Sequence, residues 1–158
     1  MPLIEEQIEI AAARADVFRF CHDITGWPDW QDQVVHAELL TSPPLRSGVL
    51  LRVDQEAGGA IFSWDAEYIT FQMPTGSRLK VIDAARSSPF RAGSELSWQF
   101  ESAGNNTLFI WKWDYQPYGF LASLADTLGR RGATQRAIKR SLAKLKELVE
   151  SGRRARLS

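Results

Sequence analysis

The sequence predicts an α+β domain in which a curved, seven-stranded antiparallel sheet wraps around one long C-terminal helix, with two short helices after the first strand. Two observations indicate this fold. Residues 120–150 repeat their apolar side chains at steps of three and four, as one face of a helix does. The segments before them alternate apolar and polar residues between short turns, which is typical of antiparallel strands. Only the long helix can cover the apolar face of such a sheet.

Seven strands are expected, because seven segments show this alternation. They cover residues 4–10, 34–40, 49–54, 61–71, 78–84, 92–102 and 107–115. The pattern is clearest in the sixth strand, where Trp98 and Phe100 face one way and polar residues face the other. In the second strand, the same alternation places Val35 and Ala37 on the inner face and His36 on the outer face.

Two short helices are expected between the first and second strands. The first covers residues 15–21, with Asp16 in its first turn, where the helix dipole favours an acid. The second has Pro28 in its first turn, where the missing N–H of proline is not needed. Trp27 and Trp30 flank this proline, and we expect both rings to fill the end of the sheet. A binding patch is the alternative interpretation of this aromatic pair.

The long helix combines two amphipathic segments. The second segment, residues 133–150, presents one apolar face: Ile138, Leu142, Leu145 and Val149. Gly129 and Gly132 lie between the segments, and each costs about 1 kcal/mol relative to alanine in a helix interior. We therefore expect one helix over residues 120–150 that bends or loosens at these glycines, followed by a basic tail over residues 151–158.

Bulk composition excludes several classes of protein. A length of 158 residues suits one domain, expected over residues 1–150. The net charge of zero predicts no nucleic-acid partner. Cys21 is the only cysteine, which excludes a disulfide framework and a cysteine-based zinc site. No apolar segment reaches the 18 or so residues of a membrane span, and acids stand where a signal peptide would be basic. We therefore expect a cytoplasmic protein.

Charge is distributed unevenly along the chain. From Arg130 onward there are ten Arg and Lys residues and two acids, whereas the preceding residues hold nine basic residues and seventeen acids. This asymmetry would suit a homodimer or an acidic partner. The alternative, which we favour, is a solvated helix face followed by the tail.

Four local patterns resemble those of a known family. In the first pattern, residues Ile8–Ala11 of the first strand lead to Asp16–Phe18 of the first helix. In the second, an acidic residue leads into Trp-Pro-Asp-Trp within residues 23–30. The third is Gly48 at the start of the third strand, and the fourth is the end of the terminal helix, residues 142–150. In these respects the chain resembles the START-like superfamily, also called SRPBCC or helix-grip, and most of all its polyketide cyclase/dehydrase branch. The usual proline before the first helix is absent. The resemblance implies a cavity between sheet and helix, and members include ligand carriers, cyclases and dehydratases.

Many of the side chains expected on the inner face of the later strands are aromatic. We expect these rings to line a pocket for a flat, apolar ligand, with a filled core as the alternative. The set is Phe62, Trp64, Trp98, Phe100, Phe109, Trp111, Trp113 and Tyr115.

No residue set in the sequence specifies a reaction. There is no Ser-His-Asp order, phosphate loop or metal-ligand spacing, so neither a cofactor nor a metal is expected. His22, Asp83 and Tyr115 are the candidates for proton transfer. We expect His22 to be a surface or loop residue. We expect Asp83 to lie beyond the buried part of its strand, with a position near the mouth of the pocket as the alternative.

Three functions remain open at this level. The first choice is a protein that binds a small apolar, aromatic or lipid-like molecule between sheet and helix. The alternative is a cofactor-free cyclase or dehydratase, in which one or two polar groups of the pocket move protons. The third is an interaction protein whose interior is filled by its own side chains.

Overall fold

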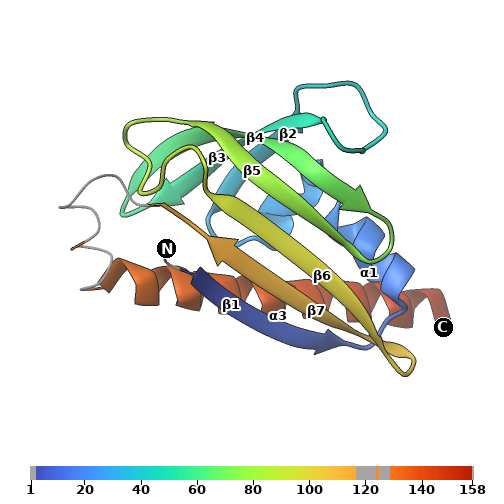
Figure 1. Cartoon of the computed structure of the whole chain (residues 1–158). Coiled ribbons are helices and arrows are strands. Elements are labelled where there is room, and N and C mark those ends of the chain that lie inside the picture. Colours follow the sequence, from blue (N-terminus) through green and yellow to red (C-terminus); the bar gives the residue numbers. More distant parts are fainter. Residues whose placement is uncertain (1–2, 117–123, 125–128, 158) are drawn as a thin grey trace.

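The computed structural model describes residues 3–116, 124 and 129–157. Within these ranges, seven strands and three helices follow in chain order (Figure 1). They are β1 (Leu3–Ile10), α1 (Arg14–Cys21), the 3-10 helix η1 (Ile24–Asp29), β2 (Val34–Leu39), β3 (Leu50–Ala57), β4 (Ala60–Gln72), β5 (Gly76–Ala84), β6 (Glu95–Ala103), β7 (Asn106–Asp114) and α3 (Arg131–Leu157).

The strands form one antiparallel sheet in the order β1-β7-β6-β5-β4-β3-β2. Strands β2 to β7 form a meander, and β1 joins its far edge by pairing with β7 from Leu3 opposite Asp114 to Ile10 opposite Thr107. The sheet curls over α3, and β1 and β7 run along the helix (Figure 1). The predicted α+β fold, a curved sheet around a C-terminal helix, is therefore confirmed.

The apolar face of α3 packs against the inner face of the sheet, as the spacing predicts. Ile138, Leu142, Leu145 and Val149 are all at most 5% exposed. The helix continues to Leu157, through most of the segment expected to be a tail. Most of the predicted first segment, residues 120–128, lies outside the described residues, and Leu124 within it is helical and exposed.

Two local predictions are wrong. Val35 is exposed, because the pairing of β2 with β3 shifts between Val34 and His36 and resets the alternation. Val34 and Ala37 are the buried residues of this strand, while His36 faces outward as expected. The second short helix begins at Ile24, so Pro28 lies near its end rather than in its first turn. The tight turns of this helix are closed by backbone bonds that do not need the proline nitrogen.

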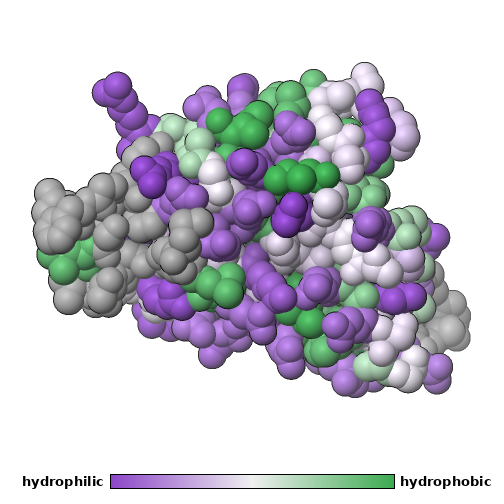
Figure 2. Space-filling model, viewed as in Figure 1, coloured by the Kyte–Doolittle hydropathy of each residue, from purple (hydrophilic) through white to green (hydrophobic). Residues whose placement is uncertain are grey.

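The outer face of the sheet is mostly hydrophilic, with isolated apolar side chains (Figure 2). Ile61 and Ile82 are examples, at 62% and 45% exposed. Neighbouring strands pair opposite charges on this face: Arg52 with Asp65 at 2.8 Å, Arg78 with Glu95 at 3.4 Å and Lys112 with Glu5 at 3.8 Å. Such exposed pairs contribute little to stability, so the inner face carries the packing energy.

Aromatic rings fill the interior at the end of the sheet nearest α1. Phe100 and Phe109 stack with ring centroids 4.8 Å apart, and Phe18 of α1 packs on Phe100 at 5.1 Å. Tyr68 and Phe71 extend the same group at 5.4 Å from each other. This end of the molecule is therefore a packed core.

The tryptophans beside Pro28 close the next layer of the interior. Trp27 is fully buried and donates its indole N–H to the carbonyl oxygen of Cys21 at 2.8 Å. Trp30 is 2% exposed and packs on Trp98 and Trp111, with ring centroids 5.6 and 6.0 Å away. The predicted structural role of this pair agrees with their burial.

Candidate functional site

A cavity of about 540 Å³ lies between the sheet and the beginning of α3. Its lining comes from the loop after η1, the ends of β3 and β7, the loop between β5 and β6, and the first turns of α3. This volume is within the range of small-molecule sites, roughly 300–1,000 Å³. The molecule is therefore packed at one end of the sheet and hollow at the other.

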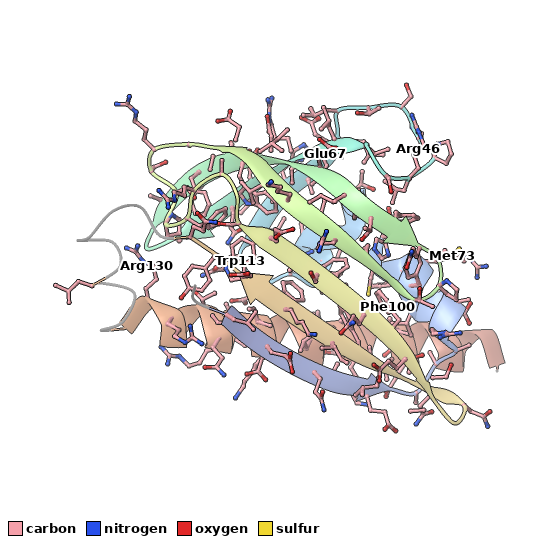
Figure 3. The ribbon with its side chains drawn as sticks, viewed as in Figure 1. Arg46, Glu67, Met73, Phe100, Trp113 and Arg130 are labelled. Carbon is pink, nitrogen blue, oxygen red and sulfur yellow. The ribbon has the colours of Figure 1, made fainter. Side chains whose placement is uncertain are left out.

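Aromatic rings form one wall of the cavity. Four of the eight rings expected from the sequence lie there: Trp64, Trp111, Trp113 and Tyr115. Phe90, from the loop between β5 and β6, joins them with its ring centroid 5.0 Å from Trp113 and 5.8 Å from Trp64. Figure 3 shows Trp113 and Arg130 at the end of the molecule where α3 begins.

The other four rings lie outside the cavity. Phe100 and Phe109 belong to the packed end, and Figure 3 shows Phe100 far along the sheet from Trp113. Trp98 lies between the two regions, against Trp30 and Trp111. Phe62 packs behind Phe90 at 5.7 Å. For the strands that carry these rings, the alternation gives the inner face correctly, but it does not give the distance along the strand at which the cavity begins.

A second wall is polar, and sequence reasoning missed it. Gln55 accepts a hydrogen bond from the indole N–H of Trp64 at 3.1 Å and donates to the amide oxygen of Gln33 at 3.4 Å. Ser88 is bonded to the backbone of Phe90. Gln31 also lines this wall. Most of these residues follow η1 or lie in a loop, where no periodicity marks them.

The loop after η1 is tied to α3 at the edge of the cavity. The guanidinium of Arg140 donates two hydrogen bonds to one carboxylate oxygen of Asp32, at 2.8 and 3.1 Å. The backbone N–H of Asp32 donates to the hydroxyl of Ser141 at 2.8 Å. These contacts hold the polar wall against the helix.

The candidates for proton transfer are not brought together. Tyr115 lines the cavity and is buried. Asp83 is exposed, beyond the bulge at which β4 and β5 change register, as expected. The expectation of a surface position for His22 is wrong, because this residue is 6% exposed inside the packed end.

Two short hydrogen bonds fix the state of His22. Its Nδ1 lies 2.7 Å from the carbonyl oxygen of Phe18, which can only accept, so Nδ1 carries the proton. Its Nε2 then accepts from the hydroxyl of Ser77 at 2.7 Å. Burial lowers the pKa of His22 from 6.5 to about 4, although the bond to Phe18 opposes this shift. The ring is a neutral core residue.

The protein should lose stability as the pH falls from about 6.5 towards 4. Unfolded His22 takes up a proton below about pH 6.5, whereas the folded protein keeps the ring neutral until its pKa of about 4. The free energy of unfolding should therefore fall by up to about 3 kcal/mol across this window, and His22 should contribute no pH dependence above it. Urea unfolding at a series of pH values measures the slope.

Two glutamine variants provide the comparison. His22→Gln keeps a partner for Ser77 and removes the titration, so its stability should depend less on pH between 6.5 and 4. His36→Gln changes the exposed histidine and should retain the slope of the unaltered protein. Equal slopes in the His22→Gln variant and the unaltered protein would contradict the assignment.

The chain is similar to known proteins in sequence and in fold. A family model described as polyketide cyclase / dehydrase and lipid transport matches residues 1–150. No curated protein matches the chain. Among solved structures, a protein from Thermus thermophilus is similar with a TM-score of 0.80 and 18% identity, covering 96% of this chain and 99% of that one.

Two further structures share the fold. The Zhui aromatase/cyclase from Streptomyces sp. R1128 has a TM-score of 0.78 and 13% identity, and the match covers 94% of this chain and 93% of that one. A START superfamily protein from Mycobacterium smegmatis has a TM-score of 0.68 and 15% identity, with 99% of both chains covered. At these identities the likeness concerns the fold. The predicted START-like resemblance is confirmed.

The described residues lack two further features. None of the helices described there is long and apolar enough to cross a membrane. The same part of the chain contains no cluster of three or more His, Cys, Asp or Glu side chains placed to hold a metal ion.

Proposed function

This chain belongs to the polyketide cyclase / dehydrase and lipid transport family, and we propose that it binds one small, largely apolar molecule between the sheet and α3. The observation that carries the proposal is the cavity of about 540 Å³ with a wall of aromatic rings. Aromatic side chains offer large, rigid, apolar contact surfaces. The cavity therefore suits a flat aromatic or lipid-like molecule better than a sugar or a nucleotide.

Binding is favoured over catalysis by a cofactor-free cyclase or dehydratase. A general base must lie within hydrogen-bond reach of the proton that it removes. The described lining contains no histidine, and its one carboxylate, Asp32, is paired with Arg140 at 2.8 Å. His22 lies outside the cavity, in the packed end. Tyr115 is the candidate for proton transfer that lines the cavity, and the described lining adds no histidine and no unpaired carboxylate to it. The described residues therefore supply a surface that holds a ligand rather than an assembled acid and base.

The basic side chains of α3 support a monomer in place of a homodimer. Lys139 lies 3.8 Å from Glu6, and Lys146 lies 2.6 Å from Glu150. Acids of the same chain therefore balance these two lysine charges, so no acidic partner is needed to do so. The single cysteine, Cys21, is buried and unbridged, which is in keeping with a reducing compartment such as the cytoplasm.

Titration with anilinonaphthalene sulfonate, a flat aromatic fluorophore, tests the binding proposal. We expect saturable binding of one molecule per chain, with energy transfer from Trp111 and Trp113, which line the cavity. The fluorescence should disappear when the protein is unfolded in urea. A linear, non-saturating signal from the folded protein would contradict the proposal.

Native mass spectrometry separates binding from catalysis. The protein is incubated with a small-molecule extract of its own cells, and the bound mass is measured at once and again after several hours. A binding protein should return the captured molecule with its mass and its fragmentation pattern unchanged. Release of a product that has lost one water, or of an isomer with a new fragmentation pattern, would instead support a cyclase or dehydratase.

A further inference from the structure

One polar side chain of the cavity has no partner in the described part of the chain. Gln31 is 8% exposed and lines the cavity, yet its amide nitrogen makes no hydrogen bond to any described residue. Buried polar groups in native proteins are almost always hydrogen-bonded, and an unpaired one calls for a physical explanation. The amide nitrogen is also closed off from water, so solvent does not satisfy it.

The other buried polar side chains of the same wall are engaged. Ser88 bonds to the backbone of Phe90, and Ser141 bonds to the carbonyl of Ala137 and to the N–H of Asp32. Each hydroxyl therefore already has a partner. This leaves the Gln31 amide as the buried side chain of the described wall with an unused donor.

The backbone of Gln31 is fixed, so only its side chain can adjust. Its N–H donates to the carbonyl of Trp27 at 2.8 Å, and its carbonyl accepts from Val34 at 3.1 Å. The preceding residue, Trp30, is locked in the tryptophan cluster. The terminal torsion of a glutamine is broad, so the amide can turn to meet a ligand without any movement of the backbone.

A second unused donor lies in the same lining. The indole N–H of Trp111 is buried without a described partner, and Trp111 itself is 6% exposed. An indole N–H can only donate. The amide nitrogen of Gln31 and the indole nitrogen of Trp111 are thus two buried donors on residues that line the cavity.

We propose that Gln31 is a specificity-determining residue that selects ligands with a hydrogen-bond acceptor oxygen, of the carbonyl type, on an otherwise apolar ring system. The inference rests on the proposed function and narrows its ligand class. The acceptor bonds to the amide of Gln31. A bare hydrocarbon of equal shape leaves this donor unpaired and binds more weakly for that reason.

Two probes of matched shape test the proposal. Methyl naphthyl ketone carries a carbonyl acceptor, and isopropenylnaphthalene replaces that oxygen with a methylene group. Each is titrated into the protein, and the quenching of tryptophan fluorescence gives the dissociation constants. The ratio of the two constants is compared between the unaltered protein and the Gln31→Met variant. Differences in the hydration of the probes cancel in this comparison, because the same two compounds are used throughout.

The preference for the ketone should fall by about five- to tenfold in Gln31→Met, as expected for the loss of one hydrogen bond. The control is Gln99→Met, the same change on the exposed face of β6, which should leave the ratio unchanged. If both probes bind and the ratio of their dissociation constants is unchanged in Gln31→Met, the proposed role of Gln31 is wrong and the proposed function stands. Failure of both probes and of anilinonaphthalene sulfonate to bind the unaltered protein would instead overturn the proposed function.

A measurement on the unaltered protein covers the case in which Gln31→Met does not fold. In nuclear magnetic resonance spectra, the side-chain amide protons of Gln31 should move downfield when the ketone binds and not when the alkene binds. Equal movement with both probes would contradict the proposal. A downfield shift confined to the ketone would support it.

Discussion

Replacing Trp30 with alanine should lower the free energy of unfolding by about 3–5 kcal/mol. Trp30 is 2% exposed, and its ring packs on Trp98 and Trp111. Its removal leaves a void at the boundary between the packed end and the cavity, which the fixed backbone of η1 and β6 cannot close. Urea unfolding followed by circular dichroism measures the loss.

The matched change is Trp113→Ala. Trp113 is half-buried and lines the cavity, stacked on Tyr115 with ring centroids 5.9 Å apart. It should lose less stability than Trp30→Ala and should weaken the binding of anilinonaphthalene sulfonate more. If Trp30→Ala keeps its stability and loses the probe, Trp30 is a ligand contact and its structural assignment is wrong.

Replacing Ala137 with tryptophan should abolish probe binding without unfolding the protein. Ala137 is 5% exposed and faces the cavity from α3. A large ring at this position occupies space that the ligand requires. Because the space already exists, we expect stability to stay level or to rise by up to about 2 kcal/mol, as cavity-filling changes commonly do. Fluorescence titration and urea unfolding measure the two effects.

Ala143→Trp is the control for this prediction. Ala143 is exposed on the same helix, so a tryptophan there should leave both binding and stability near their original values. Ala57→Trp fills the cavity from β3 and provides a second test if Ala137→Trp unfolds. Undiminished binding in a folded Ala137→Trp variant would show that the probe occupies another site.

Strand alternation predicted the inner face of the sheet because side chains of a strand point to its two faces in turn. The residues Trp64, Tyr68, Trp98 and Phe109 are all buried, as this phase requires. The same rule failed at Val35, where a change of pairing register shifts the phase by one residue. Such a shift depends on how β3 pairs with β2, and the sequence of β2 alone does not contain that information.

The position at which the packed core ends and the cavity begins could not be predicted from the sequence, for a different reason. Alternation gives a face, and the position of the hollow along that face depends on what other elements bring to it. Phe18 and His22 of the α1 region fill one end of the sheet, while Gln31 and Gln33 reach the other end from the loop after η1. The burial of His22 likewise depends on Ser77, which is distant in the chain.

The pairing of β1 with β7 has a consequence for how the chain folds. Leu3 pairs with Asp114, and the N–H of Ala11 donates to the carboxylate of Glu150, so β1 depends on elements that are made much later. Closing so large a loop carries a high entropic cost, and folds rich in such distant contacts form slowly. During synthesis, β1 leaves the ribosome long before its partner. We therefore expect the meander β2–β7 to assemble first, while the apolar side of β1 remains a target for chaperones until β7 and α3 have been made.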